Sequence, residues 1–114
     1  MSSSFFRSEL VRGELQEMTE LQAYCMKAMY TFPAFSPEKK KEYFTNLKRL
    51  IEKQEIFYAR LKLTDDPEAK MLLDNLRQAA ILFGASERDN VEEMFKELLE
   101  KITHMQSVLE AEGG

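Results

Sequence analysis

Apolar residues recur at alternating steps of four and three along most of the chain, and this spacing constrains the fold more than any other feature. Because an α-helix has 3.6 residues per turn, such residues form one apolar stripe along a helix. Four segments carry a stripe, at about residues 5–32, 37–63, 67–83 and 89–111. The sequence predicts an all-α fold, an antiparallel four-helix bundle in a single helical domain of residues 1–114, with two long N-terminal helices and short connections.

The stripes name the side chains expected to pack between the helices. They are Val11, Leu15, Met18, Gln22, Cys25, Met29, Phe32, Tyr43, Leu47, Leu50, Gln54, Phe57, Leu61, Leu72, Leu76, Ala79, Phe83, Val91, Phe95, Leu98, Ile102, Met105 and Leu109. Two of these positions hold glutamine. If the first turn centres on Ala34, Gln22 and Gln54 are offset by about 12 Å along the helix axes, so we expect that they do not meet. Five or more of the seven methionines are expected in the core.

Capping residues and prolines set the predicted boundaries. Ser36 and Asp66 each precede a proline and are expected to cap the second and third helices. Asp89 is followed three residues later by a glutamate, which resembles a capping box for the fourth helix. Gly84 stands where a left-handed residue usually ends a helix. Gly13 lies inside the first helix, and one expected reason is the close approach of another backbone.

The predicted helices differ in length, and this has a consequence for packing. The first two reach about 25 residues, which is near 40 Å at 1.5 Å per residue, whereas the third has about 17. Part of the apolar surface of the first two helices is therefore expected to stay uncovered by the rest of the bundle. It would be closed by a partner, by a second copy of the chain, or by bending.

Charge and composition exclude several classes of protein. The net charge of −4 argues against general nucleic-acid binding. Residues 37–63 carry eight Lys or Arg against four Glu, and residues 86–114 carry three against eight acids, so we expect neighbouring helices with complementary faces. One cysteine cannot form an intramolecular disulfide. No signal peptide or membrane-spanning run is recognised, and we expect a cytoplasmic protein.

No constellation of residues points to catalysis or to a cofactor. Di-iron bundles need two Glu-x-x-His pairs, but the chain has one histidine, His104. Cys25 and His104 lack the number and spacing of ligands for zinc, and nothing in the sequence places them together as a nucleophile and its base. We expect a buried, inert thiol and a surface histidine. The prediction is a protein without enzymatic activity, metal or cofactor.

Two features are candidates for binding a partner. The second predicted helix has a basic stretch, for which a solvated face is the simpler interpretation. Phenylalanines lie at the N-terminus and in the first loop, where they either dock a partner or cap the ends of the bundle. The candidate partner-binding residues are Phe5, Phe6, Phe32, Phe35, Lys39, Lys40, Lys41, Lys48 and Arg49. The methionines offer an adaptable docking surface if they are exposed.

Residues 3–12, 35–40, 50–61, 65–69 and 84–86 resemble an uncharacterised cyanobacterial family of small helical proteins, a domain of unknown function. The resemblance covers nearly the whole chain. It implies a photosynthetic bacterial cytosol as the setting, with peripheral association with thylakoids left open. It supplies no activity and no site residue.

Three hypotheses of function follow. The first is a non-enzymatic helical adaptor or regulatory protein that binds another protein, with a homodimer as one form. The second is a carrier of a small apolar ligand or pigment in the bundle interior. The third is weak association with RNA or the ribosome through the basic face of the second helix, which predicts binding that weakens steeply with salt.

Overall fold

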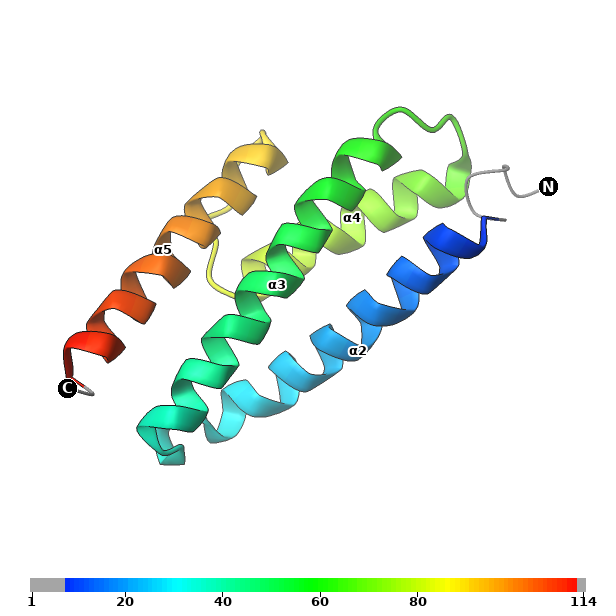
Figure 1. Ribbon diagram of the computed structural model, residues 1–114. Helices are drawn as coiled ribbons and strands as arrows, with labels where there is room; N and C mark the ends of the chain where they lie inside the picture. The colour runs from blue at the N-terminus through cyan, green and yellow to red at the C-terminus, as the bar shows by residue number, and fades with distance from the viewer. Residues whose placement is uncertain (1–7, 113–114) are drawn as a thin grey trace.

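A computed structural model describes residues 8–112, and these form four α-helices and one short 3₁₀ turn (Figure 1). The helices are α2 (Glu9–Thr31), α3 (Pro37–Leu61), α4 (Pro67–Leu82) and α5 (Val91–Glu112), and the turn η1 (Phe32–Ala34) follows α2. No strand occurs among the described residues. The predicted all-α bundle is confirmed. The link between α4 and α5 spans residues 83–90 and is longer than expected.

Side chains cap three of the helices at their N-termini. Ser36 Oγ accepts a hydrogen bond from the Lys39 amide at 3.2 Å, and Asp66 Oδ1 accepts one from the Glu68 amide at 2.9 Å. Both caps were predicted. The prediction for α5 was wrong by one residue, because Asn90 rather than Asp89 accepts from the first-turn amides. An asparagine side chain caps a helix as well as an aspartate does.

The end of α4 is fixed by a Schellman turn. Gly84 has a φ of 117°, in the left-handed region that favours glycine, as predicted. The Gly84 amide donates to the Ile81 carbonyl at 3.1 Å, and the Ala85 amide donates to the Ala80 carbonyl at 3.0 Å. Lys101 Nζ of α5 donates to the Gly84 carbonyl at 2.9 Å, so the turn is also tied to the last helix.

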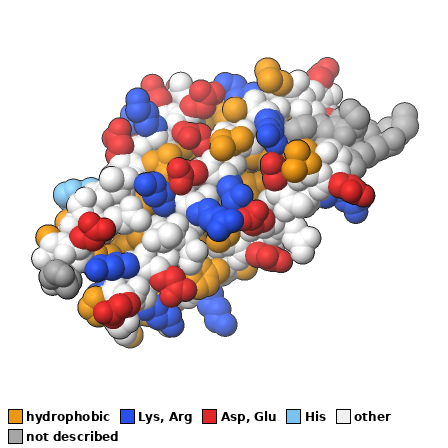
Figure 2. Space-filling view, in the orientation of Figure 1, with side chains coloured by type: hydrophobic (Ala, Val, Ile, Leu, Met, Phe, Trp, Pro, Cys, Tyr) orange, Lys and Arg blue, Asp and Glu red, His pale blue; other side chains and the backbone are white. Residues whose placement is uncertain are grey.

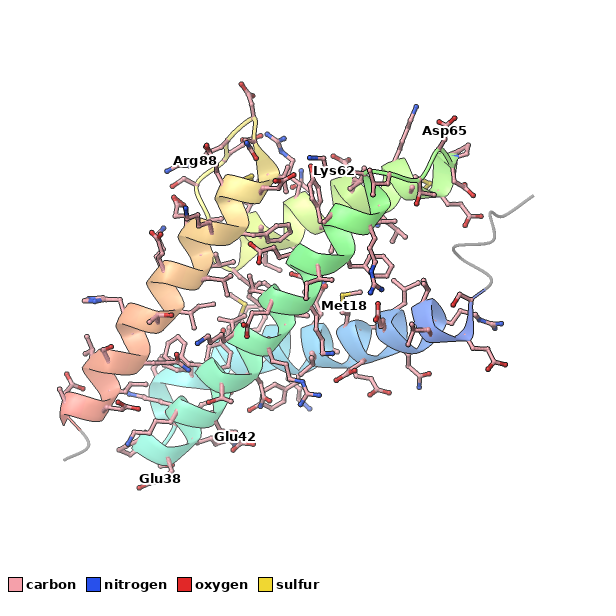
Figure 3. All side chains as sticks on the ribbon, turned by 45° about the horizontal axis from the view of Figure 1, so that its top comes forward. Met18, Glu38, Glu42, Lys62, Asp65 and Arg88 are labelled. Atoms are coloured by element: carbon pink, nitrogen blue, oxygen red, sulfur yellow. The ribbon has the colours of Figure 1, made fainter. Side chains whose placement is uncertain are left out.

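Helix α3 is the centre of the fold. It packs against α2, α4 and α5, whereas α2 packs mainly on α3 and on η1. Figure 3 shows α2 and α3 diverging from their shared loop near Glu38, with Met18 between them. The molecule is elongated, at 53 × 29 × 20 Å. Three helices are thus packed around one another, and α2 lies along one side of α3.

The expected core forms, with two corrections. All of the stripe of α3 is buried, from Tyr43 to Leu61. Only Met18 and Met94 among the described methionines are buried, so the expectation of five or more in the core was wrong. A Cβ at Gly13 would meet no atom within 4 Å, so close approach of another backbone does not explain this glycine.

Gln22 and Gln54 do meet, contrary to the prediction. Gln54 Nε2 donates to Gln22 Oε1 at 3.2 Å. Phe32, which directly follows α2, packs against Tyr43 and Phe44, with ring centroids 5.1 and 5.3 Å away. The first residues of α3 therefore extend beyond the end of α2. The hairpin pairs residues about Glu38 rather than Ala34, and the predicted axial offset disappears.

Part of the basic face of α3 is paired with α2. Arg49 and Lys53 both contact Glu17, at 2.6 and 3.2 Å, and Arg60 contacts Glu14 at 2.9 Å. Helices α3 and α5 are neighbours, as expected from their charges. Within residues 8–112, however, the ion pair that connects this basic segment to α5 is the one between Lys62 and Glu92. Most of the ion pairs of this basic segment are therefore made with acidic residues of α2.

Candidate partner-binding trough

Some residues of the apolar stripes remain partly exposed, and they are not scattered. They are Leu15, Gln22, Met29, Phe32, Leu72, Phe83 and Met105. Each lines one of two neighbouring hollows that run beside α3. Uncovered stripe residues, as expected from the unequal helix lengths, therefore exist and lie in one region, whereas the more exposed Tyr30, Leu63 and Met71 line neither hollow. We call the two hollows the apolar groove and the amide groove, and together the trough.

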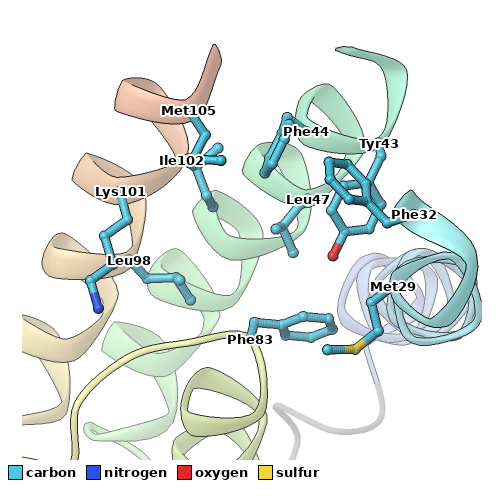
Figure 4. Close-up of a pocket in the computed structure, with 10 residues that line it drawn as sticks. All are labelled: Met29, Phe32, Tyr43, Phe44, Leu47, Phe83, Leu98, Lys101, Ile102 and Met105. Carbon is cyan, nitrogen blue, oxygen red and sulfur yellow. The ribbon is translucent and has the colours of Figure 1, made fainter. Parts of the chain in front are cut away.

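The apolar groove lies between the C-terminal end of α2 and the middle of α5, with α3 as its floor (Figure 4). Its volume is about 260 Å³. It is lined by Met29, Phe32, Tyr43, Phe44, Leu47, Phe83, Leu98, Lys101, Ile102 and Met105. Met105 is the most exposed of the stripe residues in this wall, at 42%. No carboxylate is among these lining residues.

One wall of the apolar groove depends on where α4 ends. In Figure 4, Phe83 reaches from the turn after α4 towards Met29. Because α4 stops at Leu82 and the Gly84 turn leads the chain away, no helix covers the floor beyond Phe83. The short third helix predicted from the sequence is thus the direct reason that this part of the trough is open.

An aromatic and basic cluster closes one end of the apolar groove. Phe32 packs edge-on to Phe35, with ring centroids 6.0 Å apart. Lys39 Nζ lies 4.5 Å from the centroid of Phe35, and Lys40 Nζ lies 5.4 Å from that of Phe32. These distances are those of cation–π contacts. The structure thereby joins two features, the loop phenylalanines and the lysine run, that the sequence treated separately.

The other candidate residues have different positions. Arg49 is held by Glu17, and hydrogen bonding from Lys53 lowers the pKa of the Glu17 carboxyl. Lys41 and Lys48 are half-buried on α3 and line neither groove. Phe5 and Phe6 lie outside the described residues. Of the nine predicted residues, Phe32 lines the apolar groove, and Phe35, Lys39 and Lys40 form its end.

The amide groove lies between α2 and α4, over Gln54 of α3. Its volume is about 510 Å³. It is lined by Leu15, Met18, Thr19, Gln22, Gln54, Leu72, Asn75, Leu76, Gln78, Ala79 and Leu82. Four of these side chains carry amide groups and none is ionisable. The amide groove differs in this from the face shown in Figure 2, where acidic and basic side chains interleave.

The side chains considered for catalysis or metal binding do not form a catalytic or metal-binding cluster. Cys25 is fully buried, and burial raises the pKa of its thiol to about 11. Burial also raises the pKa of the Tyr43 hydroxyl to about 12. His104 is exposed on α5. Among residues 8–112, no three side chains of His, Cys, Asp or Glu lie together as metal ligands.

Nine of the ten residues that line the apolar groove were missed as site residues. Among them, Met29, Phe83 and Met105 are partly exposed stripe residues that the sequence assigned to the core. The signal that would have found them is the difference in helix length combined with methionine on the stripes, since methionine adapts to irregular or changing partners. What the sequence lacked was the tertiary position of the end of α4.

The fold and the trough define a small all-helical protein with an open groove beside its central helix. In the part of the chain that the structure describes, no helix has the length and apolar character needed to cross a bilayer. The chain belongs to the family described as Domain of unknown function (DUF1825), whose family profile matches residues 3–109. Comparison with curated proteins gave no match, and neither did comparison with solved structures.

Proposed function

We propose that this protein is a non-enzymatic adaptor or regulator that binds a partner protein through the apolar groove, in the cytosol of a cyanobacterium. The observation that carries the proposal is that four of the seven partly exposed stripe residues line the apolar groove. Met29, Phe32 and Met105 lie at positions whose spacing marks them for burial, yet the chain itself leaves them partly open. A partner that inserts apolar side chains would complete their burial.

The chemistry of the groove favours an acidic partner. Lys101 lines it, and Lys40 lies over Phe32 at its end. With no carboxylate among the lining residues, a partner with acidic side chains beside its apolar anchors would be complementary in charge. Such side chains would add more to the rate and specificity of binding than to its affinity.

The carrier hypothesis is the second candidate. The amide groove, at about 510 Å³, falls within the range of roughly 300 to 1,000 Å³ typical of ligand pockets, but the apolar groove, at about 260 Å³, is smaller. One or two inserted side chains fit this volume better than a pigment does. The RNA hypothesis is weakened by the ion pairs of α3, since Arg49, Lys53 and Arg60 are already matched by acids of α2.

The test uses two exposed methionines. Met105→Glu places a carboxylate in the apolar groove, whereas Met71→Glu makes the same change on α4, where Met71 is 69% exposed and outside both grooves. Each variant and the wild type would be used to capture proteins from cyanobacterial cells, with quantitative mass spectrometry. We expect a protein retained by the wild type and by Met71→Glu but reduced more than about tenfold with Met105→Glu.

Circular dichroism would verify that both variants stay helical. Identical sets of captured proteins for all three baits would contradict the proposal. A small molecule that co-purifies with the wild type and is lost with Met105→Glu would favour the carrier instead. Light scattering after size exclusion would show whether the partner is a second copy.

A further inference from the structure

The amide groove contains a buried hydrogen-bonding group that the protein itself does not satisfy. Gln54 is 1% exposed, and its Oε1 has no hydrogen-bond partner, although its Nε2 donates to Gln22. Gln22 Nε2 in turn has only a weak contact, to the Met26 sulfur at 3.9 Å. A buried acceptor without a partner is unfavourable, and native proteins rarely leave one without a reason.

The walls around this amide pair are neutral. Thr19, Asn75 and Gln78 surround the hollow together with aliphatic side chains, whereas 32% of the whole chain is charged. Depletion of charge is a property of the centre of a protein interface, and exposed amides supply hydrogen bonds there without the cost of desolvating an ion. The amide groove therefore suits an occupant that is uncharged where it faces Gln54.

The two grooves lie next to each other along α3. Tyr43, Leu47 and Gln54 lie at steps of four and seven residues, which places them on one stripe of α3, and this stripe forms the floor of both grooves. Consecutive residues at the end of α4 line the two, Leu82 the amide groove and Phe83 the apolar groove. Helix α2 walls the trough from Leu15 to Phe32, about 25 Å along its axis.

We propose that the whole trough binds one amphipathic helix of the partner protein, and that Gln54 forms a hydrogen bond with an uncharged residue of that helix. This inference rests on the proposed function and adds the chemistry of the partner. Gln54 lies seven residues from Leu47 and eleven from Tyr43 along α3, a separation of about 10 to 16 Å. The partner helix therefore carries Asn, Gln, Ser or Thr seven to eleven residues from its apolar anchors.

Charge sets which end of the partner helix lies where. The basic side chains Lys39, Lys40 and Lys101 all belong to the apolar groove or its end, and the amide groove has none. Acidic residues of the partner helix accordingly flank its apolar anchors, and its neutral residue lies at the far end. This polarity distinguishes the trough from a general hydrophobic surface.

The experiment selects peptides against the full-length protein. A displayed library of helical peptides of about 18 residues, long enough for the trough, would be enriched on the wild type. Dissociation constants of the selected peptides would then be measured by fluorescence anisotropy for four proteins: wild type, Gln54→Leu, Met105→Glu and Met71→Glu. We expect peptides with acidic residues beside the apolar anchors and the neutral residue at the stated spacing.

The expected changes separate the two grooves. Gln54→Leu should weaken binding by about fivefold to tenfold, the value of one lost hydrogen bond, and Met71→Glu should change nothing. A peptide with leucine at the neutral position should bind Gln54→Leu as well as the parent peptide binds the wild type. If Gln54→Leu proves unstable, Gln78→Glu at the exposed rim replaces it and should weaken binding by placing a charge in the uncharged wall that faces the neutral residue of the peptide.

Three outcomes would overturn the inference in different ways. Peptides that lose affinity for Met105→Glu but bind Gln54→Leu and Gln78→Glu as they bind wild type would refute the role of the amide groove and leave the proposed function standing. Peptides that bind Met105→Glu as tightly as wild type would remove the proposed function as well. A small molecule found in the amide groove of protein purified from its native source would also refute the binding of a partner helix there.

Discussion

The two halves of α5 carry the same stripe of apolar residues but have different surroundings. At its N-terminal half, Met94 and Phe95 are fully buried between α3 and α4. Three helical turns later, Met105 occupies an equivalent position and is 42% exposed, because α4 has already ended. The difference teaches that periodicity decides which side of a helix faces inwards. Whether a neighbour is present on that side depends on the lengths of the other helices.

The largest expected effect compares the buried N-terminal half of α5 with its exposed C-terminal half. Phe95→Ala removes a ring that is fully buried and packs edge-on to Tyr58 at 5.8 Å, so it should lower the free energy of unfolding by about 3 to 5 kcal/mol. Met105→Ala should cost less than about 1 kcal/mol, because water already reaches this side chain. Urea denaturation of both variants measures the difference. Equal losses would mean that the apolar groove is closed in solution.

The amide pair in the trough predicts an intermediate and asymmetric effect. Gln22→Leu leaves the buried Gln54 Nε2 without its acceptor and should cost about 1 to 2 kcal/mol. Gln54→Leu should cost less, since it removes the donor together with the unsatisfied Oε1. The comparison is made by thermal and urea unfolding. A larger loss for Gln54→Leu than for Gln22→Leu would show that this amide pair is satisfied in a way that the geometry does not indicate.

The exposed side of α2 offers a smaller effect of opposite sign. Gly13→Ala should stabilise the protein by up to about 1 kcal/mol, because alanine favours a helix and its Cβ meets no atom within 4 Å. Gly84→Ala is the matched control and should destabilise, because alanine rarely adopts a φ of 117°. A loss of stability for Gly13→Ala would indicate that something contacts this side of α2.

The smallest expected effect concerns how α2 is held to α3. Lys53 and Arg49 lower the pKa of Glu17 in the folded protein below its ordinary value of 4.5. A depressed carboxyl pKa contributes stability that is present above 4.5 and is lost as the pH falls through the folded value. The melting temperature should therefore fall slightly less between pH 7 and lower pH for Glu17→Gln than for the wild type. An unchanged pH dependence would mean that this exposed pair contributes nothing measurable.

Most of the fold could be predicted from the sequence because its signals are local. Ser36 and Asp66 cap helices through bonds that span two or three residues, and Gly84 ends one through its own backbone angle. The stripe of α3 is buried throughout because this helix has neighbours on several sides. Such features depend on a few consecutive residues or on one helix face, and both are visible in the sequence.

The site could be predicted only in part, because it depends on register between helices. The prediction that Gln22 and Gln54 lie apart was wrong. The packing of Phe32 against Tyr43 and Phe44 sets the register of α2 and α3, and the centre of the loop does not. Predicting the trough would have required the position of the end of α4 relative to α2 and α5. Methionines were assigned to the core on their hydrophobicity alone, which does not distinguish a closed core from a groove.

The Schellman turn at Gly84 also has an evolutionary consequence. One additional turn of helix before this glycine would carry α4 over Tyr43 and Leu47, and the protein would fill its own apolar groove. The number of residues between Asp66 and Gly84 therefore determines whether the groove is open. Members of the family with a longer interval are expected to have a closed bundle and to lack the proposed interaction, and the length of the interval can be read from sequence alone.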